Sequence, residues 1–116
     1  MPRPETVIQR EIIDHLAGKG IYPVHVPNGA VLAGNAKRRA IQMNALKRDG
    51  LKVGFPDLSV YNSAGRMGHI EVKDAKGEQS EAQKTCQTIL ESLGHKYAVC
   101  RSVSDVDAVL NEWGWQ

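Results

Sequence analysis

The sequence is poor in cysteines, aromatic residues and long apolar runs, and these shortages exclude several classes of protein. Its two cysteines, Cys86 and Cys100, lie far apart and form no C-x-x-C pair, so neither a disulfide framework nor a thiolate zinc site is expected. No apolar run is long enough to cross a bilayer, and the N-terminus lacks the apolar core of a signal peptide. We therefore expect a cytoplasmic protein with reduced cysteines and no membrane partner.

The 116 residues suffice for one domain with its own core, and we assign residues 1–116 to it. The net charge of +2 is unevenly distributed. Residues 1–52 hold nine Lys and Arg against four Asp and Glu (+5), whereas residues 53–116 hold six against nine (−3). A basic half beside an acidic half suits a phosphodiester substrate, although ordinary scatter in a small protein would look the same.

Residues 54–61 and 69–74 predict a β-hairpin. The two runs contain β-branched and aromatic residues, alternate in polarity and are separated by a Gly-, Asn- and Ser-containing turn at 62–68. Because side chains alternate along a strand, Asp57 on the first run and Glu71 and Lys73 on the second are expected on one face, with apolar residues on the other. The hairpin can therefore bury one face and bring two carboxylates and an ammonium together on the other.

Two carboxylates provide oxygen ligands for a hard divalent ion such as Mg²⁺ or Mn²⁺. A lysine two residues beyond a ligand can orient a water molecule or stabilise charge developing on a phosphate. Taken alone, however, a Glu-x-Lys triplet is more often an ion pair on a solvated strand face.

The remaining periodicity predicts an α/β fold, a small mixed sheet of about four strands flanked by helices. Beyond the hairpin, helices are expected at 5–18, 36–49, 80–93 and after Ser102 or Ser104, and strands at 21–26 and 96–100. The second hairpin strand, the third helix and the last strand should form a right-handed parallel β-α-β unit. Ser80 and Gln83 match a capping box at the start of that helix.

The first predicted helix has two candidate acidic residues. At 100° per residue, Glu5 lies on the side of the apolar residues, whereas Glu11 lies well off it. A carboxylate at the margin of a buried stripe needs a partner, although Glu5 could also simply complement the N-terminal end of the helix dipole.

The helix expected at 36–49 is strongly basic. Its cations and the one that follows could lie along a DNA backbone and contact phosphates, namely Lys37, Arg38, Arg39, Lys47, Arg48 and Lys52. A solvated helix face is the simpler alternative. No aromatic residue is interleaved with the basic ones, so base stacking is not expected here.

Several short motifs resemble the VRR-NUC (virus-type replication–repair nuclease) branch of the PD-(D/E)XK nucleases. They are Gly54-Phe-Pro-Asp-Leu58, Ile70-Glu-Val-Lys73 and Gly77-Glu-Gln-Ser-Glu-Ala-Gln83, with Pro27-Asn28-Gly29 and Leu46-Lys47-x-x-Gly50 upstream. The resemblance covers about residues 5 to 104. It implies a restriction-endonuclease-like core and a metal-dependent endodeoxyribonuclease that leaves a 5′-phosphate and a 3′-hydroxyl.

The resemblance also implies roles for individual residues. Asp57, Glu71 and the Val72 carbonyl would hold Mg²⁺ or Mn²⁺, and Lys73 would act on the attacking water. An acidic residue of the first helix completes the site in the family; Glu5 fits that position best and Glu11 is the reserve. Gln83 would orient Lys73 or the substrate, with no small-molecule cofactor needed.

By analogy with stand-alone members of that branch, we expect a homodimer that cuts four-way (Holliday) junctions in DNA repair. Cleavage of flaps, ends or duplex DNA without junction selectivity remains open. A non-catalytic DNA-binding or assembly module is the third alternative, and the intact Asp57, Glu71 and Lys73 set argues against it.

Overall fold

The structure is a computed structural model that describes residues 3–27 and 32–115. Its elements, in chain order, are α1 (Pro4–Gly18), β1 (Tyr22–His25), α2 (Ala36–Arg48), β2 (Leu58–Tyr61), β3 (Met67–Val72), α3 (Glu81–Ser92), β4 (Lys96–Cys100) and α4 (Val103–Trp113). The expected α/β fold is confirmed, with four strands and four helices among the described residues. None of these helices has both the length and the apolar composition of a membrane span.

The four strands form one mixed sheet in the order β1-β2-β3-β4. β1 pairs with β2 and β2 with β3 in antiparallel fashion, whereas β3 and β4 are parallel. The predicted hairpin is therefore β2-β3, and the predicted β-α-β unit is β3-α3-β4. β1, which contains Pro23, lies at the sheet edge where a residue without a backbone N–H is tolerated.

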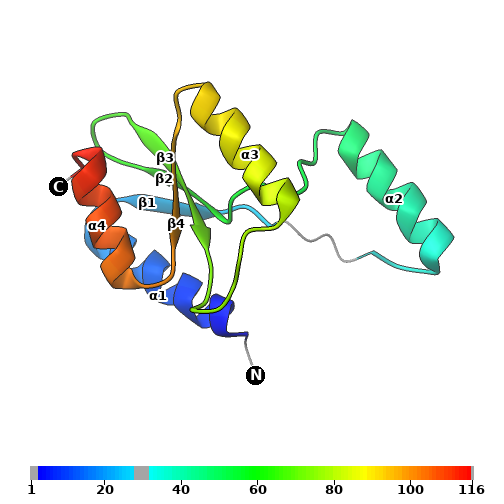
Figure 1. Ribbon diagram of the computed structural model, residues 1–116, viewed down its shortest axis with the longest axis horizontal. Coiled ribbons are helices and arrows are strands. Elements are labelled where there is room, and N and C mark those ends of the chain that lie inside the picture. The colour runs from blue at the N-terminus through cyan, green and yellow to red at the C-terminus, as the bar shows by residue number, and fades with distance from the viewer. Residues whose placement is uncertain (1–2, 28–31, 116) are drawn as a thin grey trace.

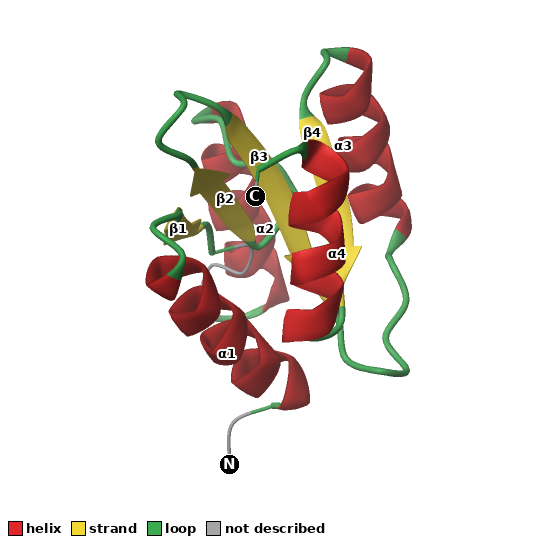
Figure 2. Ribbon diagram, turned by 90° about the vertical axis from the view of Figure 1, so that its left-hand side faces the viewer, coloured by secondary structure: helices red, strands yellow, loops and turns green. Residues whose placement is uncertain are grey.

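Helices cover both faces of the sheet (Figure 2). α1 and α4 pack on one face around a core that includes Ile12, Leu58, Ile70 and Leu110. α3 lies on the opposite face, next to β4. Residues 68–72 of β3 are consequently all buried, so the hairpin face with Glu71 is covered as well, not solvated.

Local sequence signals explain where the helices begin. Pro4 occupies the first turn of α1, where its missing N–H has no helical partner to lose. α3 begins with the predicted capping box, in which the Ser80 side chain accepts from the Gln83 N–H and the Gln83 side chain accepts from the Ser80 N–H. Ser102, one of the two expected serines, caps α4.

α2 projects away from the rest of the molecule (Figure 1). None of its residues is buried, and its Cα atoms lie more than 8 Å from those of every other described helix and strand. Asn35 caps its start, and Gly50, at φ 105°, follows its end as predicted. The upstream turn expected at Pro27–Gly29 falls partly outside the described residues.

Candidate active site

The β2-β3 register places the two predicted carboxylates opposite one another. Leu58 pairs with Ile70, so Asp57 precedes β2 directly across from Glu71 on the same face of the sheet. Asp57 is fixed there because its Oδ2 accepts a hydrogen bond of 2.7 Å from the backbone N–H of Val72. The same stretch of β3 therefore supplies Glu71 and anchors Asp57.

Glu71 is fully buried, and its two carboxylate oxygens have different surroundings. Oε1 accepts a 2.5 Å hydrogen bond from the Tyr97 hydroxyl and a 3.1 Å hydrogen bond from Nε2 of Gln79. Oε2 has no hydrogen-bond partner within the described part of the chain. The nearest cation is the Lys73 ammonium, whose Nζ lies 4.0 Å from Oε2. Lys73 itself is only 9% exposed.

Burial and the neighbouring charges shift two pKa values at the site. Loss of hydration raises the pKa of Asp57, and the negative charge of Glu71 adds to the shift, while the Val72 N–H and the Lys73 ammonium oppose it. Burial, reinforced by the hydrogen bond to Glu71, strongly raises the pKa of Tyr97. The Tyr97 hydroxyl therefore keeps its proton and acts as a donor to Glu71.

Glu5 lies at the same end of the sheet. A Cβ atom placed on Gly77 would be 3.3 Å from Oε2 of Glu5 and 3.3 Å from Cδ of Lys73, so both side chains approach one point of the loop after β3. Glu5 is half-buried, whereas Glu11 is exposed. This geometry supports the preference for Glu5, whose role remains a prediction.

The loop between β3 and α3 is held by a residue that the sequence did not single out. Nη1 of Arg101 donates to the carbonyl oxygens of Asp74 and Gly77 at 2.6 and 2.7 Å. Asp74 closes the turn by accepting from the N–H groups of Lys76 and Gly77. Arg101 follows β4, so only the parallel β3-β4 pairing brings it to this loop.

The two glutamines near the start of α3, Gln79 and Gln83, make different hydrogen bonds. Gln83 uses its side-chain oxygen in the capping box and makes no hydrogen bond to Lys73 in the described structure. Gln79, which precedes the helix, is instead the amide that reaches Glu71, and Oε1 of Gln87 holds it at 2.8 Å. The polar loop sequence carried no signal for this role.

The last residue of β1 and the residue that follows it also contact Asp57. The Val26 N–H donates to the Asp57 carbonyl at 2.8 Å, and Nδ1 of His25 lies 3.0 Å from the same oxygen. Gln9 of α1 lies 3.2 Å from that imidazole nitrogen. Neither His25 nor Gln9 was predicted at the site, because helical and strand periodicity cannot show which elements meet.

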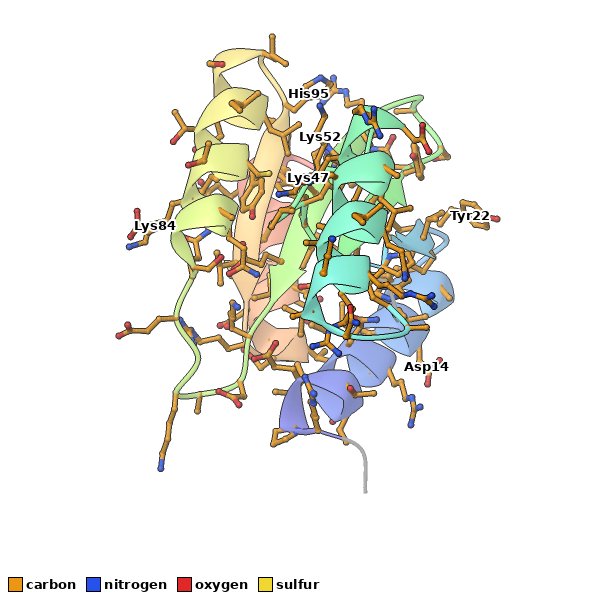
Figure 3. All side chains as sticks on the ribbon, turned by 90° about the vertical axis from the view of Figure 1, so that its right-hand side faces the viewer. Asp14, Tyr22, Lys47, Lys52, Lys84 and His95 are labelled. Atoms are coloured by element: carbon orange, nitrogen blue, oxygen red, sulfur yellow. The ribbon has the colours of Figure 1, made fainter. Side chains whose placement is uncertain are left out.

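The predicted DNA-contacting cations are all exposed, five on α2 and Lys52 on the segment that returns from it. Arg39 also donates from Nη1 to the Gly34 carbonyl at 2.9 Å. Figure 3 shows Lys47 and Lys52 on the side of the molecule from which α2 projects. The chain leaves the sheet after His25 and re-enters it at Leu58, directly after Asp57, so α2 lies in the insertion between β1 and the carboxylate pair.

The donor set fits a hard divalent ion. Mg²⁺ is usually held by one or two carboxylates and retains several waters, and here two carboxylates face each other with one buried oxygen lacking any donor in the described structure. An unpaired buried carboxylate oxygen is costly unless a cation or a donor compensates it. No group of three or more His, Cys, Asp or Glu side chains converges within residues 3–27 and 32–115, so waters and a peptide carbonyl would complete the coordination.

Solved structures share the fold of this chain. One, described as a VRR_NUC domain, has a TM-score of 0.70 and 18% sequence identity and covers 97% of this chain and 99% of its own. Another, described as a VRR_NUC domain protein, has a TM-score of 0.67 and 20% identity and covers 97% of this chain and 89% of its own. These likenesses establish a VRR-NUC-type fold.

The family model of the VRR-NUC domain matches residues 3–104. The chain therefore belongs to the VRR-NUC family, a family of nucleases, and the resemblance inferred from its motifs is confirmed. No curated protein sequence matches this chain.

Proposed function

We propose that this protein is a Mg²⁺- or Mn²⁺-dependent endodeoxyribonuclease that cuts four-way DNA junctions as a homodimer. The observation that supports catalysis is the buried Oε2 of Glu71, which has no donor in the described structure, lies across from Asp57 and is 4.0 Å from the Lys73 ammonium. Membership of a nuclease family makes a phosphodiester the expected substrate class.

Asp57, Glu71 and the Val72 carbonyl would hold the metal ion, with Glu5 assisting from α1. When bound, the ion would polarise the phosphodiester and lower the pKa of a coordinated water. The protein contributes a preorganised carboxylate pair, because Asp57 is tied to the Val72 N–H and Glu71 to Tyr97 and Gln79. Such preorganisation avoids reorganisation at the moment of reaction.

Lys73 positions or activates the attacking water and supports the pentavalent transition state. Its ammonium is nearly buried beside Glu71, so its charge acts in a medium that screens it less than water does. In-line attack with cleavage of the P–O3′ bond leaves a 5′-phosphate and a 3′-hydroxyl.

Gln83 would orient Lys73 or the substrate. Its amide oxygen accepts from the Ser80 N–H and keeps a second lone pair, which could accept from the Lys73 ammonium. Its amide nitrogen is a donor and would instead act on the substrate. A phosphate oxygen at the N-terminus of α3 would accept from it and also be favoured by the helix dipole.

α2 would bind the DNA backbone. Residues 36–48 carry five Lys and Arg and no acidic residue, and none of these residues is buried. The segment that follows α2 leads to Asp57 and β2, which supports a DNA path that extends from the site towards this charge. Phosphate contacts position a duplex without reading its sequence, which suits recognition of DNA shape.

Exposed apolar surface supports a dimer. Ile41 on α2 is 59% exposed, and Ile89 on α3 and Leu93 at its end are 53% and 68% exposed. On α3 lies an apolar groove of about 290 Å³ lined by Lys52, Phe55, Cys86, Ile89 and Leu90. Exposed apolar patches of this kind mark interaction sites, and a two-fold dimer would supply two active sites for paired cuts.

The two cysteines are compatible with a cytoplasmic location. Both are free, and burial raises the pKa of the Cys100 thiol to about 12. A thiol that stays protonated is unreactive, so Cys100 serves as a small core residue.

One cleavage panel tests the proposed substrate. Wild-type protein with Mn²⁺ or Mg²⁺ is compared on a four-way junction, a flap, a linear duplex and single-stranded DNA, with Lys73→Ala as the inactive control. We expect symmetric paired nicks on the junction alone, and Lys73→Ala should retain DNA binding while losing cleavage. Cleavage by Lys73→Ala at the wild-type rate would contradict the role of Lys73.

The other outcomes separate the alternatives. Similar cutting of all four substrates would support the catalytic site and contradict junction selectivity. Absence of cutting on every substrate would favour the non-catalytic DNA-binding module.

Calorimetry tests the metal site independently of activity. Mn²⁺ should bind to the wild type and not to Asp57→Ala, whereas Asp14→Ala, which removes an exposed carboxylate of α1, should bind as the wild type does. If Asp57→Ala binds Mn²⁺ with the wild-type affinity, the assignment of Asp57 as a metal ligand is wrong.

A further inference from the structure

The Tyr97 hydroxyl and the Gln79 amide occupy one oxygen of Glu71 and leave the other free. Oε1 accepts from both groups, at 2.5 Å and 3.1 Å. A carboxylate oxygen has two lone-pair sites, so two donors saturate it. Oε2 has no hydrogen-bond partner in the described structure and faces Lys73 at 4.0 Å, beyond hydrogen-bond distance. Only Oε2 is therefore available to a ligand.

Both donors are themselves held in place. Tyr97 is 7% exposed, and its position on β4 follows from the parallel register, in which it pairs with His69, two residues before Glu71 on the same face. Gln79 precedes α3, and its amide nitrogen also donates to Oε1 of Gln87 at 2.8 Å. Glu71 therefore has a fixed carboxylate orientation and not merely a fixed backbone position.

We infer that Tyr97 and Gln79 are positioning residues that restrict Glu71 to coordinating a divalent cation through Oε2 alone. This inference rests on the proposed metal-dependent function and adds a determinant of metal selectivity. Neither residue touches the metal or the substrate; each acts through Glu71.

One-oxygen coordination favours small cations. Mg²⁺ requires near-ideal octahedral geometry with short bonds, whereas Ca²⁺ accepts longer bonds and two-oxygen carboxylate ligands. A carboxylate with one oxygen saturated cannot chelate through both. Removing a donor from Oε1 should thus let the carboxylate of Glu71 rotate, which weakens binding of Mn²⁺ and Mg²⁺. It should also allow Ca²⁺ to bind through both carboxylate oxygens.

The test compares Mn²⁺ and Ca²⁺ binding by calorimetry in the wild type and in Tyr97→Phe. The substitution removes one hydroxyl and retains the ring. We expect the Mn²⁺ Kd to rise about tenfold, as for other groups that orient metal ligands, and the Ca²⁺ Kd to rise less or to fall. Tyr61→Phe, which alters a 41% exposed tyrosine on β2, should change neither affinity.

Gln79→Leu provides a second variant, which removes the other donor without altering the buried ring. It should change the Mn²⁺-to-Ca²⁺ preference in the same direction. Circular dichroism and thermal melting of each variant establish that the fold is retained.

The outcomes distinguish three explanations. A loss of Mn²⁺ preference in both variants supports the inference. Equal weakening of both ions, or unchanged affinities, overturns it and assigns Tyr97 and Gln79 a purely structural role, while the metal site stands. Failure of the wild type to bind Mn²⁺ overturns the proposed metal site and this inference together.

Discussion

At the scale of single residues, Gly54 shows how closely α3 approaches the segment that leads to Asp57. Its φ is +81°, and a Cβ atom there would lie 2.5 Å from the carbonyl carbon of Ala82 and 2.7 Å from the nitrogen of Gln83. These are backbone atoms of the first turn of α3, which cannot move aside as the end of a flexible side chain could. Glycine is therefore required at the position that leads into Pro56 and Asp57.

Gly54→Ala should be markedly destabilising, and Gly65→Ala is its matched control. Gly65 has nearly the same φ, +76°, but open space around its Cβ position. The left-handed backbone alone costs about 1–2 kcal/mol in each variant. In urea unfolding, we expect Gly54→Ala to lose more free energy of unfolding than Gly65→Ala. Gly54→Ala should also lower the cleavage rate. Equal losses would show that α3 can move away from Gly54 at no cost.

Glu5→Gln and Glu11→Gln form a matched pair on α1 that tests the acidic residue of the first helix. Glu5 approaches the Gly77 loop beside Lys73, whereas Glu11 is exposed. We expect Glu5→Gln to lower the single-turnover cleavage rate by about tenfold or more, in the range of groups that support metal ligands. Glu11→Gln should cleave as the wild type does. The reverse pattern would assign the role to Glu11.

At the scale of elements, α2 differs from the other helices because it packs on no other helix or strand in the described structure. Its stability as a helix depends on local signals, namely the Asn35 cap and Lys47 and Arg48 in its last turn, which complement the helix dipole. Charge on α2 can therefore be altered with little effect on the folded core.

A triple variant in which glutamine replaces Lys37, Arg38 and Arg39 should bind DNA more weakly than the wild type. Its DNA affinity should also depend less steeply on salt concentration. Each phosphate contact contributes about 0.9 to the slope of log K against log salt on duplex DNA. The variant loses up to about three phosphate contacts, so the magnitude of this slope should decrease by up to about three times that value. The matched control removes three exposed cations outside α2, Lys19, Arg66 and Lys96. Equal slopes for the two variants would place the DNA elsewhere.

The contact between α1 and α4 predicts a pH dependence of stability. The hydrogen bond from His15, 2.7 Å long, and the nearby Lys19 lower the pKa of Asp107. A carboxyl whose pKa is lower in the folded state stabilises the fold above its unfolded value of 3.8, and that contribution is lost as the pH falls through the folded value. Asp107→Asn should thus be less stable than the wild type near neutral pH.

Urea midpoints measured from pH 6 to pH 3 check this prediction, and the difference between Asp107→Asn and the wild type should shrink below pH 3.8. Asp14→Asn, which alters an exposed carboxylate of α1 that is in no described ion pair, should match the wild type throughout. A difference that stays constant with pH would mean that packing and not charge distinguishes the variant.

At the scale of the whole molecule, the projecting α2 makes the protein more extended than its length requires. The radius of gyration is 15.3 Å, whereas a compact domain of this length has about 13 Å. An extended segment with exposed Ile41, together with an apolar groove on α3, is a surface that a second copy can cover.

We expect twice the monomer mass in analytical ultracentrifugation. The Ile41→Glu variant should be more monomeric than the wild type at the same concentration. It should also make single nicks in the junction where the wild type makes paired cuts. Tyr22→Glu alters a residue of similar exposure, 69%, on β1 and should leave the dimer intact. A wild type that sediments as a monomer at micromolar concentration would exclude this mode of paired cutting.

The sequence by itself determined the elements and the pairing of the two carboxylates. Alternation in β2 and β3 placed Asp57, Glu71 and Lys73 on one face, and the capping box at Ser80 marked the start of α3. These features depend on neighbours within a few residues, so periodicity and capping chemistry suffice to predict them.

Only the tertiary structure decided what surrounds the carboxylates. Tyr97, Gln79 and Arg101 reach the site through the parallel β3-β4 register and the path of the loop before α3, neither of which leaves a local pattern in the sequence. The burial of Glu71 on the face that α3 covers likewise depends on packing between distant segments. Contacts of this kind arise when whole elements meet, and for that reason the residues that orient Glu71 could not be predicted while Glu71 itself could.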